Sequence, residues 1–370
     1  MSKEIQKVMF HLNSLGKGGA ERVVSLLANE FAKEGTEVII ATEWYSEEEY
    51  ELEPGVRRIH VGLSEQQEEG SRIARQWFRL LNLRKLLQQE KPQVLLSFCV
   101  KANYRAMIAS KGTKTPVIVS VRNDPKIDYV GTVNRWMNKL FLNKAAGCVF
   151  QTQEAKEFFD PVLQQKSIII CNPVNEKYLK ARRKKAEKKI VTVGRLVAQK
   201  NQLLLVKAFE QLLKKYPEYH LYLYGDGSDD ERKEQLLEYV AGQKLWEKIH
   251  FMGLSSTLEQ DMADAAMFVL SSDYEGMPNA LMEAMALGLP VISTDCPCGG
   301  SGYWIEHKVT GQLVPVGEEG PMRQAMEYYI ENPDKALEIG ENAKKRLQEA
   351  AIDKVYGKWK NYIGKVLAKG

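Results

Sequence analysis

Short apolar runs alternate with amphipathic stretches along the whole chain. Runs of three to five mostly apolar residues are too short for buried helices and predict buried strands. The stretches 19–33, 71–89 and 132–144 have apolar residues three or four positions apart, which predicts helices. The strands expected from these runs are 8–10, 38–41, 94–98, 117–121, 148–150 and 168–170, then 190–193, 221–224, 250–252, 268–270 and 291–293. Alternating strands and helices predict parallel sheets covered on both faces, so we expect an α/β protein of two Rossmann-like domains.

The length of the chain indicates two domains, and a polar segment near its middle indicates where they meet. At 370 residues the chain is too long for one ordinary core. We expect an N-terminal domain of residues 1–173, a second domain of residues 174–351, and a last helical segment, 352–370. The polar run 180–189 follows the boundary and is rich in Lys and Arg. It is either a nucleic-acid patch or a solvated linker, and its position favours the linker.

Composition narrows the class of protein. Hydrophobic content of 44% and charged content of 27% are globular values. No apolar run approaches the ~18 residues of a membrane span, and no secretion signal precedes the first strand, so we expect a cytoplasmic location. Five scattered cysteines fit reduced thiols. Cys296 and Cys298 form a Cys-x-Cys pair, but no cluster of His or Cys supports metal binding there, and we expect neither metal nor cofactor.

Charge is distributed unevenly along the chain. Residues 71–144 contain 15 Lys and Arg against 3 Asp and Glu, a net charge of +12, whereas the whole chain carries +4. Such a basic region suits nucleic acid, an anionic membrane surface or a pyrophosphate substrate. A solvated basic surface is the simpler alternative.

The segment 275–292 contains the most informative pattern in the chain. Pro278 suits the first position of a helix, and Gly288 followed by Pro290 ends it. Met277 precedes the helix and has no oxygen to cap it, so the first amides are left open to an anion. Glu275 and Glu283 bracket that helix start, and could contact sugar hydroxyls on either side of a bound phosphate. The alternative is a surface helix without a cap, carrying two solvated glutamates.

This segment resembles the E-x7-E signature of the family 4 retaining glycosyltransferases, including the small and apolar residues between and after the two glutamates. The resemblance implies the GT-B fold, in which two Rossmann-like domains face a central cleft and the last helix crosses back to the first domain. It implies an acceptor-binding N-terminal domain and a C-terminal domain that binds a nucleotide sugar. Glu283 would then hold the ribose hydroxyls, Glu275 would hold the donor sugar, and the amides near Asn279, Ala280 and Leu281 would hold the diphosphate.

Loops after other expected strands extend the resemblance. The segment from Gly194 to Asn201 resembles the family's G-R-x-x-x-x-K-N, in which Arg195 and Lys200 would neutralise the leaving diphosphate. Gly225-Asp226-Gly227 resembles the family's glycine-rich turn. Gly253 and Leu254 match the loop whose backbone meets the nucleobase.

The first strand is followed by a glycine loop that contains Gly16, Gly18 and Gly19. A dinucleotide fingerprint would need a third glycine where Glu21 stands, so that motif fails. The loop instead resembles the family's Gly-Gly loop, which lies near the donor diphosphate and the acceptor. His11 ends the first strand close to this loop, so it is a further candidate for a role in the site.

The first domain also departs from the family. Many members carry a His after the strand at 117–121, whereas Arg122, Asn123 and Asp124 follow here. We expect these three residues to contact the acceptor, although Asp124, which stands before Pro125, is also a turn signal. The segment after Gly300 departs as well, because the family's Pro-x-Glu-Ile-Ile is absent.

The function expected from these features is retaining transfer of a sugar from a nucleotide sugar, with UDP as the expected nucleotide. The acceptor would be a glycan or a polyprenyl-diphosphate-linked saccharide. Three alternatives stay open: a GT-B nucleotide-sugar 2-epimerase, a basic nucleic-acid-binding protein, and an inactive scaffold. The second lacks the interleaved aromatic and basic motifs of a nucleic-acid-binding module, so no nucleic acid is expected as a partner.

The basic helix expected at 71–87 could meet a membrane. As a helix this segment places Ile73, Trp77, Leu80, Leu81 and Leu87 along one side, flanked by arginines. One possibility is a helix packed on the sheet with a solvated basic face. The other is contact with an anionic membrane surface, which would make the protein peripheral on the inner face of the cell membrane. The residues expected at that contact are Arg72, Arg75, Trp77 and Arg79.

Overall fold

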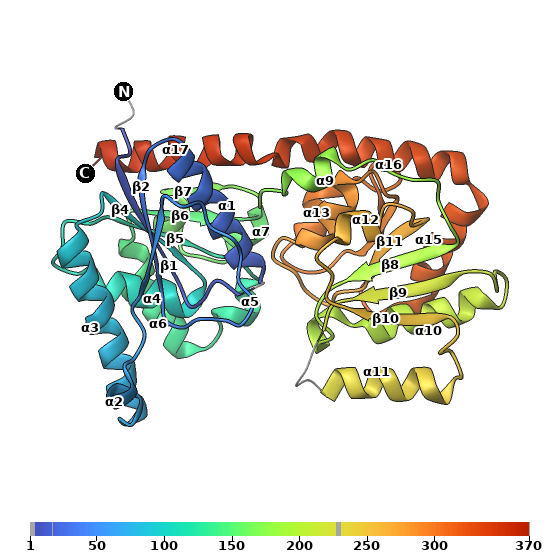
Figure 1. The fold of residues 1–370 in the computed structure, drawn as a ribbon, viewed down its shortest axis with the longest axis horizontal. Coiled ribbons are helices and arrows are strands. Elements are labelled where there is room, and N and C mark those ends of the chain that lie inside the picture. The colour runs from blue at the N-terminus through green and yellow to red at the C-terminus, as the bar shows by residue number, and fades with distance from the viewer. Residues whose placement is uncertain (1–3, 17, 227–230, 370) are drawn as a thin grey trace. The chain divides into compact units, whose positions relative to one another are not determined.

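The computed structural model describes residues 4–16, 18–226 and 231–369, so Lys17 and Gly227 of the two glycine loops lie outside the described residues. The chain divides into two compact units (Figure 1). Unit 1 is Met1–Pro173 together with Ile352–Gly370, and unit 2 is Val174–Ala351. No helix among the described residues is long and apolar enough to span a membrane.

Unit 1 is built on a seven-stranded parallel sheet with the order β3-β2-β1-β4-β5-β6-β7. Its central strands are buried on both faces, as parallel sheets covered by helices require. The strand order reverses between β1 and β4, which is where open α/β sheets bind ligands. The strands are β1 (Lys7–Leu12), β2 (Glu37–Thr42), β3 (Val56–His60), β4 (Val94–Phe98), β5 (Val117–Ser120), β6 (Gly147–Phe150) and β7 (Ser167–Ile169).

Helices cover this sheet, and the last helix of the chain is one of them. Phe31 of α1 packs on Tyr356 of α17, with ring centroids 4.8 Å apart. Trp359 of α17 is fully buried and stacks on Phe98, and Tyr362 accepts a hydrogen bond of 2.9 Å from the backbone N–H of Cys148. The helices are α1 (Gly19–Lys33), α2 (Glu65–Glu68), α3 (Arg72–Glu90), α4 (Val100–Ala109), α5 (Pro125–Asp128), α6 (Thr132–Leu140), α7 (Gln153–Glu157), α8 (Pro161–Gln164) and α17 (Ile352–Lys369).

Unit 2 contains a six-stranded parallel sheet with the order β10-β9-β8-β11-β12-β13. The order reverses between β8 and β11, which again defines a switch point. The strands are β8 (Lys189–Val193), β9 (His220–Tyr224), β10 (Ile249–Gly253), β11 (Met267–Leu270), β12 (Val291–Thr294) and β13 (Gln312–Val314).

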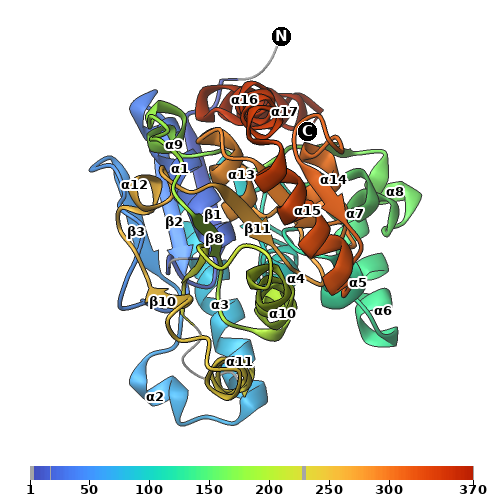
Figure 2. The ribbon, with the colours of Figure 1, turned by 90° about the vertical axis from the view of Figure 1, so that its right-hand side faces the viewer.

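The helices of unit 2 pack their apolar sides onto this sheet. Phe209 of α10 and Met326 of α15 belong to one buried cluster with Val269 of β11. Figure 2 looks onto this unit and shows α10, α11 and α15. The helices are α9 (Glu176–Lys180), α10 (Gln202–Leu213), α11 (Glu231–Gly242), α12 (Leu258–Asp261), α13 (Asn279–Ala286), α14 (Gly300–Trp304), α15 (Glu319–Glu331) and α16 (Pro333–Leu347).

The expected fold class, two Rossmann-like parallel sheets, is confirmed, but the pattern missed two strands. β3 and β13 are edge strands. β3 reads Val-Arg-Arg-Ile-His with no buried residue, and β13 has only three residues, so neither forms a run of apolar residues like those of the other strands. Pro278 is the N-cap of α13 rather than its first helical residue, because its ψ of 101° is extended.

The run 180–189 is not a free linker. Arg183 donates to the carbonyl oxygen of Gly288 at 3.1 Å, just beyond the end of α13. The backbone N–H groups of Lys184 and Glu187 donate to Ala263 and Asp264 at 2.9 and 2.8 Å. The run therefore lies along unit 2, and Arg183 offsets the partial negative charge at the end of α13.

Candidate functional site

Two loops meet at the switch point of unit 2, one after β8 and one after β11. The side chain of Asn201 donates to Asp273 at 2.8 Å, and that of Gln199 donates to the carbonyl oxygen of Tyr274 at 3.0 Å. The backbone N–H of Asp273 donates in return to Gln199 at 2.9 Å. These bonds fix residues 198–201 and 271–275 to one another at the carboxyl edge of the sheet.

Lys200 and Glu275 form an ion pair within this junction. The Glu275 side chain is 7% exposed and that of Lys200 is 16% exposed, so water screens their attraction only in part. The hydroxyl of Ser272 donates to the same carboxylate oxygen of Glu275 at 2.7 Å. The sequence placed both residues in the site but did not indicate that they contact each other. A diphosphate that bound Lys200 would meet an ammonium group already held in place by Glu275.

The helix α13 begins beside this ion pair without a side-chain cap. Trp304 donates to the sulfur of Met277 at 2.9 Å. Met277 therefore packs inward and does not cap the helix. A Cβ on Gly300 would lie 2.0 Å from the carbonyl oxygen of Gly276, which shows how closely α14 packs against the loop. Glu283 is buried one turn into α13. The helix start at 279–281 is thus held rigidly, and its dipole favours a bound anion.

Three glycines lie side by side where β8, β9 and β10 end. The N–H of Gly194 donates to Tyr224 at 2.9 Å, and the N–H of Gly225 donates to Gly253 at 2.7 Å. Gly225 has a φ of +126°, and a Cβ there would lie 2.1 Å from the carbonyl oxygen of Gly194. Arg195 follows Gly194 and is exposed at this edge. Leu254 is exposed too, so this edge presents backbone, one cation and one apolar side chain.

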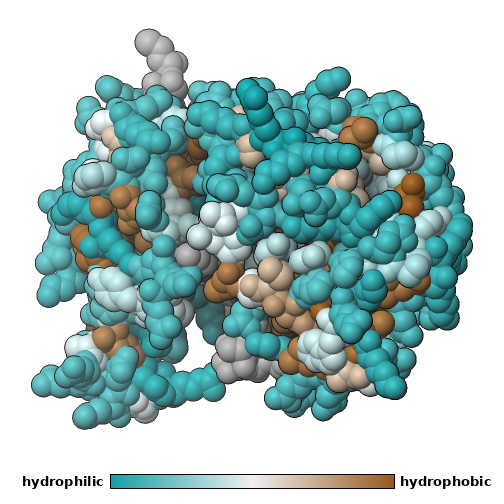
Figure 3. Space-filling model, turned by 45° about the vertical axis from the view of Figure 1, so that its right-hand side comes forward, coloured by the Kyte–Doolittle hydropathy of each residue, from teal (hydrophilic) through white to brown (hydrophobic). Residues whose placement is uncertain are grey.

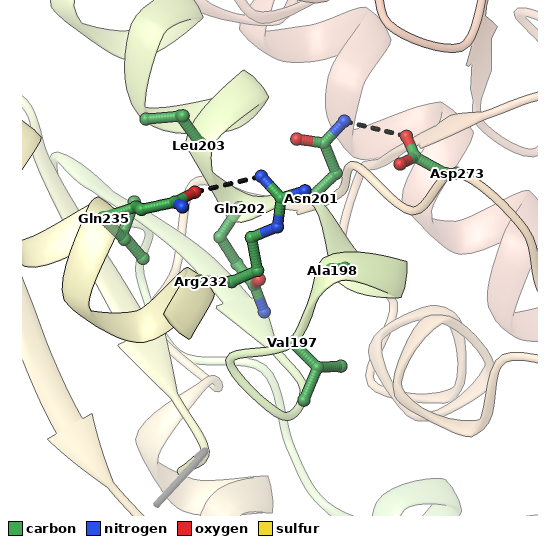
Figure 4. A pocket seen from close by; sticks show the side chains of 9 residues that line it. Val197, Ala198, Asn201, Gln202, Leu203, Arg232, Gln235 and Asp273 are labelled. Carbon is green, nitrogen blue, oxygen red and sulfur yellow. Dashed lines mark hydrogen bonds between the residues drawn. The ribbon is translucent and has the colours of Figure 1, made fainter. Parts of the chain in front are cut away.

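Two hollows open along the same edge, and Asp273 lines both of them. The first lies between the loop after β8 and the helix α11 and has about 540 Å³ of empty space (Figure 4). The second lies beside the ends of β12 and β13 and has about 970 Å³. Residues that line the first are Val197, Ala198, Asn201, Gln202, Leu203, Arg232, Gln235, Leu236 and Asp273.

The corresponding edge of unit 1 carries the first glycine loop. Gly18 is the N-cap of α1 and makes no side-chain cap, and its N–H donates to the carbonyl oxygen of Gly16 at 2.7 Å. A Cβ on Gly18 would lie 2.2 Å from a carboxylate oxygen of Glu21. Gly19 begins the helix. This loop connects β1 to α1, as the sequence indicated, and the strand order places it at the switch point of unit 1.

The residues expected to contact the acceptor have separate roles in the structure. Arg122 lies 4.7 Å above the ring of Phe98 and donates to Asn172 at 3.0 Å. Burial lowers the pKa of Arg122 to about 10. No carboxylate lies within ion-pair distance of this guanidinium in the described part of the chain. Arg122 is thus a cation without a counter-charge at the carboxyl edge of β5.

Asn123 and Asp124, which follow Arg122, form hydrogen bonds with residues of α5. Asp124 is buried and accepts a hydrogen bond of 2.9 Å from the N–H of Lys126. Of its two expected roles, acceptor contact and turn formation, the structure shows the turn. Asn123 donates to Asp128 at 3.2 Å. Burial raises the pKa of Asp128 above its usual value. Sequence reasoning did not single out Asp128, because the contact of this side chain with Asn123 depends on how α5 folds back.

A buried cluster at the ends of β1 and β2 was also missed. Glu43 pairs with Arg105 of α4, and the Nε of Arg79 lies 3.4 Å from its carboxylate. His11 is fully buried, with Nδ1 3.0 Å from the carbonyl oxygen of Ala41. Because Arg79 turns toward Glu43, we remove it from the expected membrane contact. The three charged residues come from distant segments, so spacing could not have indicated this cluster.

Known protein families match nearly the whole chain. A model described as Glycosyl transferases group 1 matches residues 174–346, and one described as Glycosyltransferase Family 4 matches residues 17–178. The chain is 26% identical over 370 residues to a Campylobacter jejuni α-1,4-N-acetyl-D-galactosaminyltransferase whose named substrate is a diphospho-undecaprenol-linked saccharide; the match covers 98% of this chain and 99% of that protein. It is 29% identical over 246 residues to an uncharacterized glycosyltransferase of Methanocaldococcus jannaschii, over 60% of each chain.

Solved glycosyltransferase structures have the same fold. Sucrose-phosphate synthase from Thermosynechococcus elongatus aligns with a TM-score of 0.83 at 17% identity, covering 99% of this chain and 100% of that one. Anabaena HepE, solved with UDP-glucose, aligns with a TM-score of 0.81 at 16% identity, covering 98% and 100%. These likenesses confirm the expected GT-B fold.

Proposed function

This chain belongs to the group 1 and family 4 glycosyltransferases, and on that premise we propose that it transfers a sugar, with retention of configuration, from a UDP-sugar to a polyprenyl-diphosphate-linked saccharide. The observation that carries the proposal is the junction at the switch point of unit 2. There Lys200, Glu275 and the open start of α13 lie together, so a cation, a carboxylate and a helix dipole adjoin one another.

Each part of the donor has a chemically suitable partner in unit 2. Arg195 and Lys200 would hold the diphosphate together with the amides at 279–281, because fixed positive charge stabilises a leaving phosphate. Glu275 would hold hydroxyls of the sugar, and Glu283 those of the ribose. Gly194, Gly225 and Gly253, with Leu254, would let the backbone approach the nucleoside.

Arg122 supports an anionic acceptor. A buried guanidinium without a carboxylate partner is costly, and a phosphate bound at the same edge would supply the missing negative charge. The name of the Campylobacter relative includes a diphospho-undecaprenol carrier, which agrees with this chemistry. Asn123 and Asp128 would orient the acceptor, and Gly16, Gly18 and Gly19 would let the backbone of unit 1 approach a phosphate.

The protein's contribution to the reaction would be positioning and charge stabilisation. In a retaining transfer of this kind the acceptor oxygen attacks the face that the leaving phosphate vacates, and that phosphate takes the proton. Lys200 and Arg195 would stabilise the charge that develops on the leaving diphosphate, and Glu275 would hold Lys200 in position before the donor arrives.

Titration with free UDP tests the assignment of the two carboxylates. We expect Glu283→Ala to weaken UDP binding by about tenfold, because it would remove a charge-assisted hydrogen bond to the ribose. Glu275→Gln should leave UDP binding within a few-fold of wild type and should slow transfer. Equal losses of UDP affinity in both variants would mean that the ribose and sugar assignments are wrong.

We also propose that the enzyme works at an anionic membrane surface. Arg72, Arg75 and Trp77 lie on the exposed side of α3, and a lipid-linked acceptor would require such contact. Each basic residue near an anionic surface contributes about 1 kcal/mol to attachment.

A further inference from the structure

Helices α5 and α6 present an exposed apolar surface that the sequence did not single out. Val133 is 72% exposed and Trp136 is 61% exposed, three positions apart on α6. Ile127 and Val130, just before α6, are exposed as well. Figure 3 shows one face of the molecule, which is largely hydrophilic with a few hydrophobic residues scattered over it. Four large apolar residues within ten positions are more than the scattered exposure that needs no explanation.

The helix α3 presents a second surface of the same kind. Ile73 is 83% exposed, Trp77 is 59% exposed and Leu81 is partly exposed, at intervals of four residues. Leu83, Leu86 and Leu87 of the same helix are buried, so α3 uses a different side to pack on its unit. The apolar residues at its N-terminal end are therefore not needed for the core.

Helix α4 lies between these two surfaces and fixes their spacing. On one side Arg105 donates to Gln76 of α3 at 3.0 Å, and on the other Tyr104 donates to Asn138 of α6 at 2.7 Å. The two tryptophans lie one and two positions from these bonds. With roughly 10 Å between neighbouring helix axes, the two apolar surfaces lie on the order of 20 Å apart in one helical layer.

Helices α3, α4, α5 and α6 carry an excess of positive charge, although the short helix α2, which packs on α3, adds the exposed glutamates Glu65, Glu68 and Glu69. Three acidic residues occur between positions 71 and 144, and each is engaged within the protein. Glu90 pairs with Lys7 and Arg57, while Asp124 caps α5 and Asp128 accepts from Asn123. Exposed basic residues of the layer are Arg72, Arg75, Lys85, Lys101, Lys126, Arg135 and Lys139.

We propose that unit 1 docks on an anionic lipid bilayer through both surfaces at once, with Trp77 and Trp136 as two separate interfacial anchors. Tryptophan beside basic residues is the composition of an interfacial membrane contact. A second copy of this chain would bring one positive layer against another, so charge complementarity favours the bilayer.

Helix α5 connects the exposed apolar surface of α5 and α6 with the edge of the sheet where we propose that the acceptor binds. Crossover helices run antiparallel to the strands, so the N-terminal ends of α3 and α4 lie at the carboxyl edge of the sheet. Ile127 follows Arg122 by five residues. A bilayer that contacts Ile127 and Trp136 would thus deliver a lipid diphosphate beside Arg122. This step rests on the proposed function, and the docking adds α6 to the membrane contact proposed there for α3.

Sedimentation with vesicles tests the proposal without donor or acceptor. We expect the wild type to bind phosphatidylcholine vesicles containing phosphatidylglycerol at low salt, and to bind pure phosphatidylcholine at least tenfold less. We expect the partition coefficient to fall about tenfold in Val133→Ser/Trp136→Ser and about tenfold in Ile73→Ser/Trp77→Ser. The variant with all four substitutions should show a fall of about a hundredfold. The matched control is Trp246→Ser, whose tryptophan is half exposed in unit 2 and should not matter.

Unchanged UDP affinity in every variant will show that unit 2 is intact. The proposal is overturned if the Val133→Ser/Trp136→Ser variant binds vesicles as the wild type does, or if the wild type stays in the supernatant. A dimer in solution that Trp136→Ser disrupts would assign the surface to a second copy and would also overturn it. A protein that docks on vesicles but fails to bind any nucleotide sugar would contradict the proposed function alone.

Discussion

Lys200 and Glu275, which we propose as residues of the donor site, also have a structural role. Glu275 is almost fully buried, and Lys200 with the hydroxyl of Ser272 satisfies its charge. Removing one partner of a buried pair leaves the other charge without compensation, which is far more costly than losing an exposed pair. Arg195 lies exposed on the same loop, so its removal should leave no buried charge without a partner.

We therefore expect Lys200→Met to lower both activity and stability. Transfer should fall by on the order of 10²-fold, and the free energy of unfolding by roughly 3 kcal/mol. Arg195→Ala should lower kcat/KM similarly without changing the urea midpoint. The double variant Lys200→Met/Glu275→Gln should regain stability but not activity. Full stability of the single Lys200→Met variant would argue against the ion pair.

His11 makes stability depend on pH. Burial lowers the pKa of His11 from 6.5 to about 4, so the unfolded chain binds a proton at this position more readily than the folded protein. Stability from the neutral imidazole is therefore full above pH 6.5 and is lost as the pH falls toward 4. Between pH 7 and pH 5 this amounts to about 2 kcal/mol.

Urea unfolding at both pH values measures this contribution. The drop in the free energy of unfolding between pH 7 and pH 5 should be about 2 kcal/mol smaller in His11→Asn than in the wild type, since carboxylates common to both cancel in the comparison. An equal drop in the two proteins would show that His11 is not held neutral.

Elements whose signals are local could be predicted from the sequence. The α13 segment carries its breaker residues and both glutamates within a few positions, so the helix and its open start were accessible to sequence reasoning. The cluster of Glu43, Arg79 and Arg105 was not, because three separate segments create it. The edge strand β3 was missed because a half-exposed strand has no continuous apolar run.

The junction of β8 and β9 gives a prediction at this scale. Gly225→Ala would force a Cβ to within 2.1 Å of the backbone of Gly194 at a φ of +126°. We expect the loop to shift and UDP affinity to fall at least tenfold. Gly317→Ala is the matched control, because Gly317 has a φ of +77° but nothing within 4 Å of its Cβ position. It should cost about 1 kcal/mol of stability and leave UDP binding unchanged. Equal UDP affinity in both variants would remove the Gly225 backbone from the donor site.

At the scale of the whole molecule, the last helix belongs to the first unit. Trp359 of α17 is fully buried, stacks on Phe98 and lies 5.5 Å from the guanidinium of Arg122. The C-terminal helix thus supports the edge where we propose that the acceptor binds. Periodicity predicted the helix, while its placement in unit 1 was expected only from the family resemblance.

Trp359→Ala should therefore weaken unit 1 selectively. Truncating a fully buried tryptophan costs about 4 kcal/mol. Hydrogen exchange read by peptide should show lost protection in β4, β5 and β6, while peptides of unit 2 and the affinity for UDP stay as in the wild type. Uniform loss of protection in both units would mean that they unfold together.

The most direct test of the central claim is transfer itself, with the anomeric configuration of the product determined by NMR. The protein is incubated with a panel of UDP-sugars and a short-chain polyprenyl-diphosphate-linked saccharide. We predict that one UDP-sugar gives a glycosylated acceptor with the anomeric configuration of the donor, and that Arg195→Ala reduces its formation by on the order of 10²-fold. Release of free sugar without an acceptor, or a product of inverted configuration, would contradict the account.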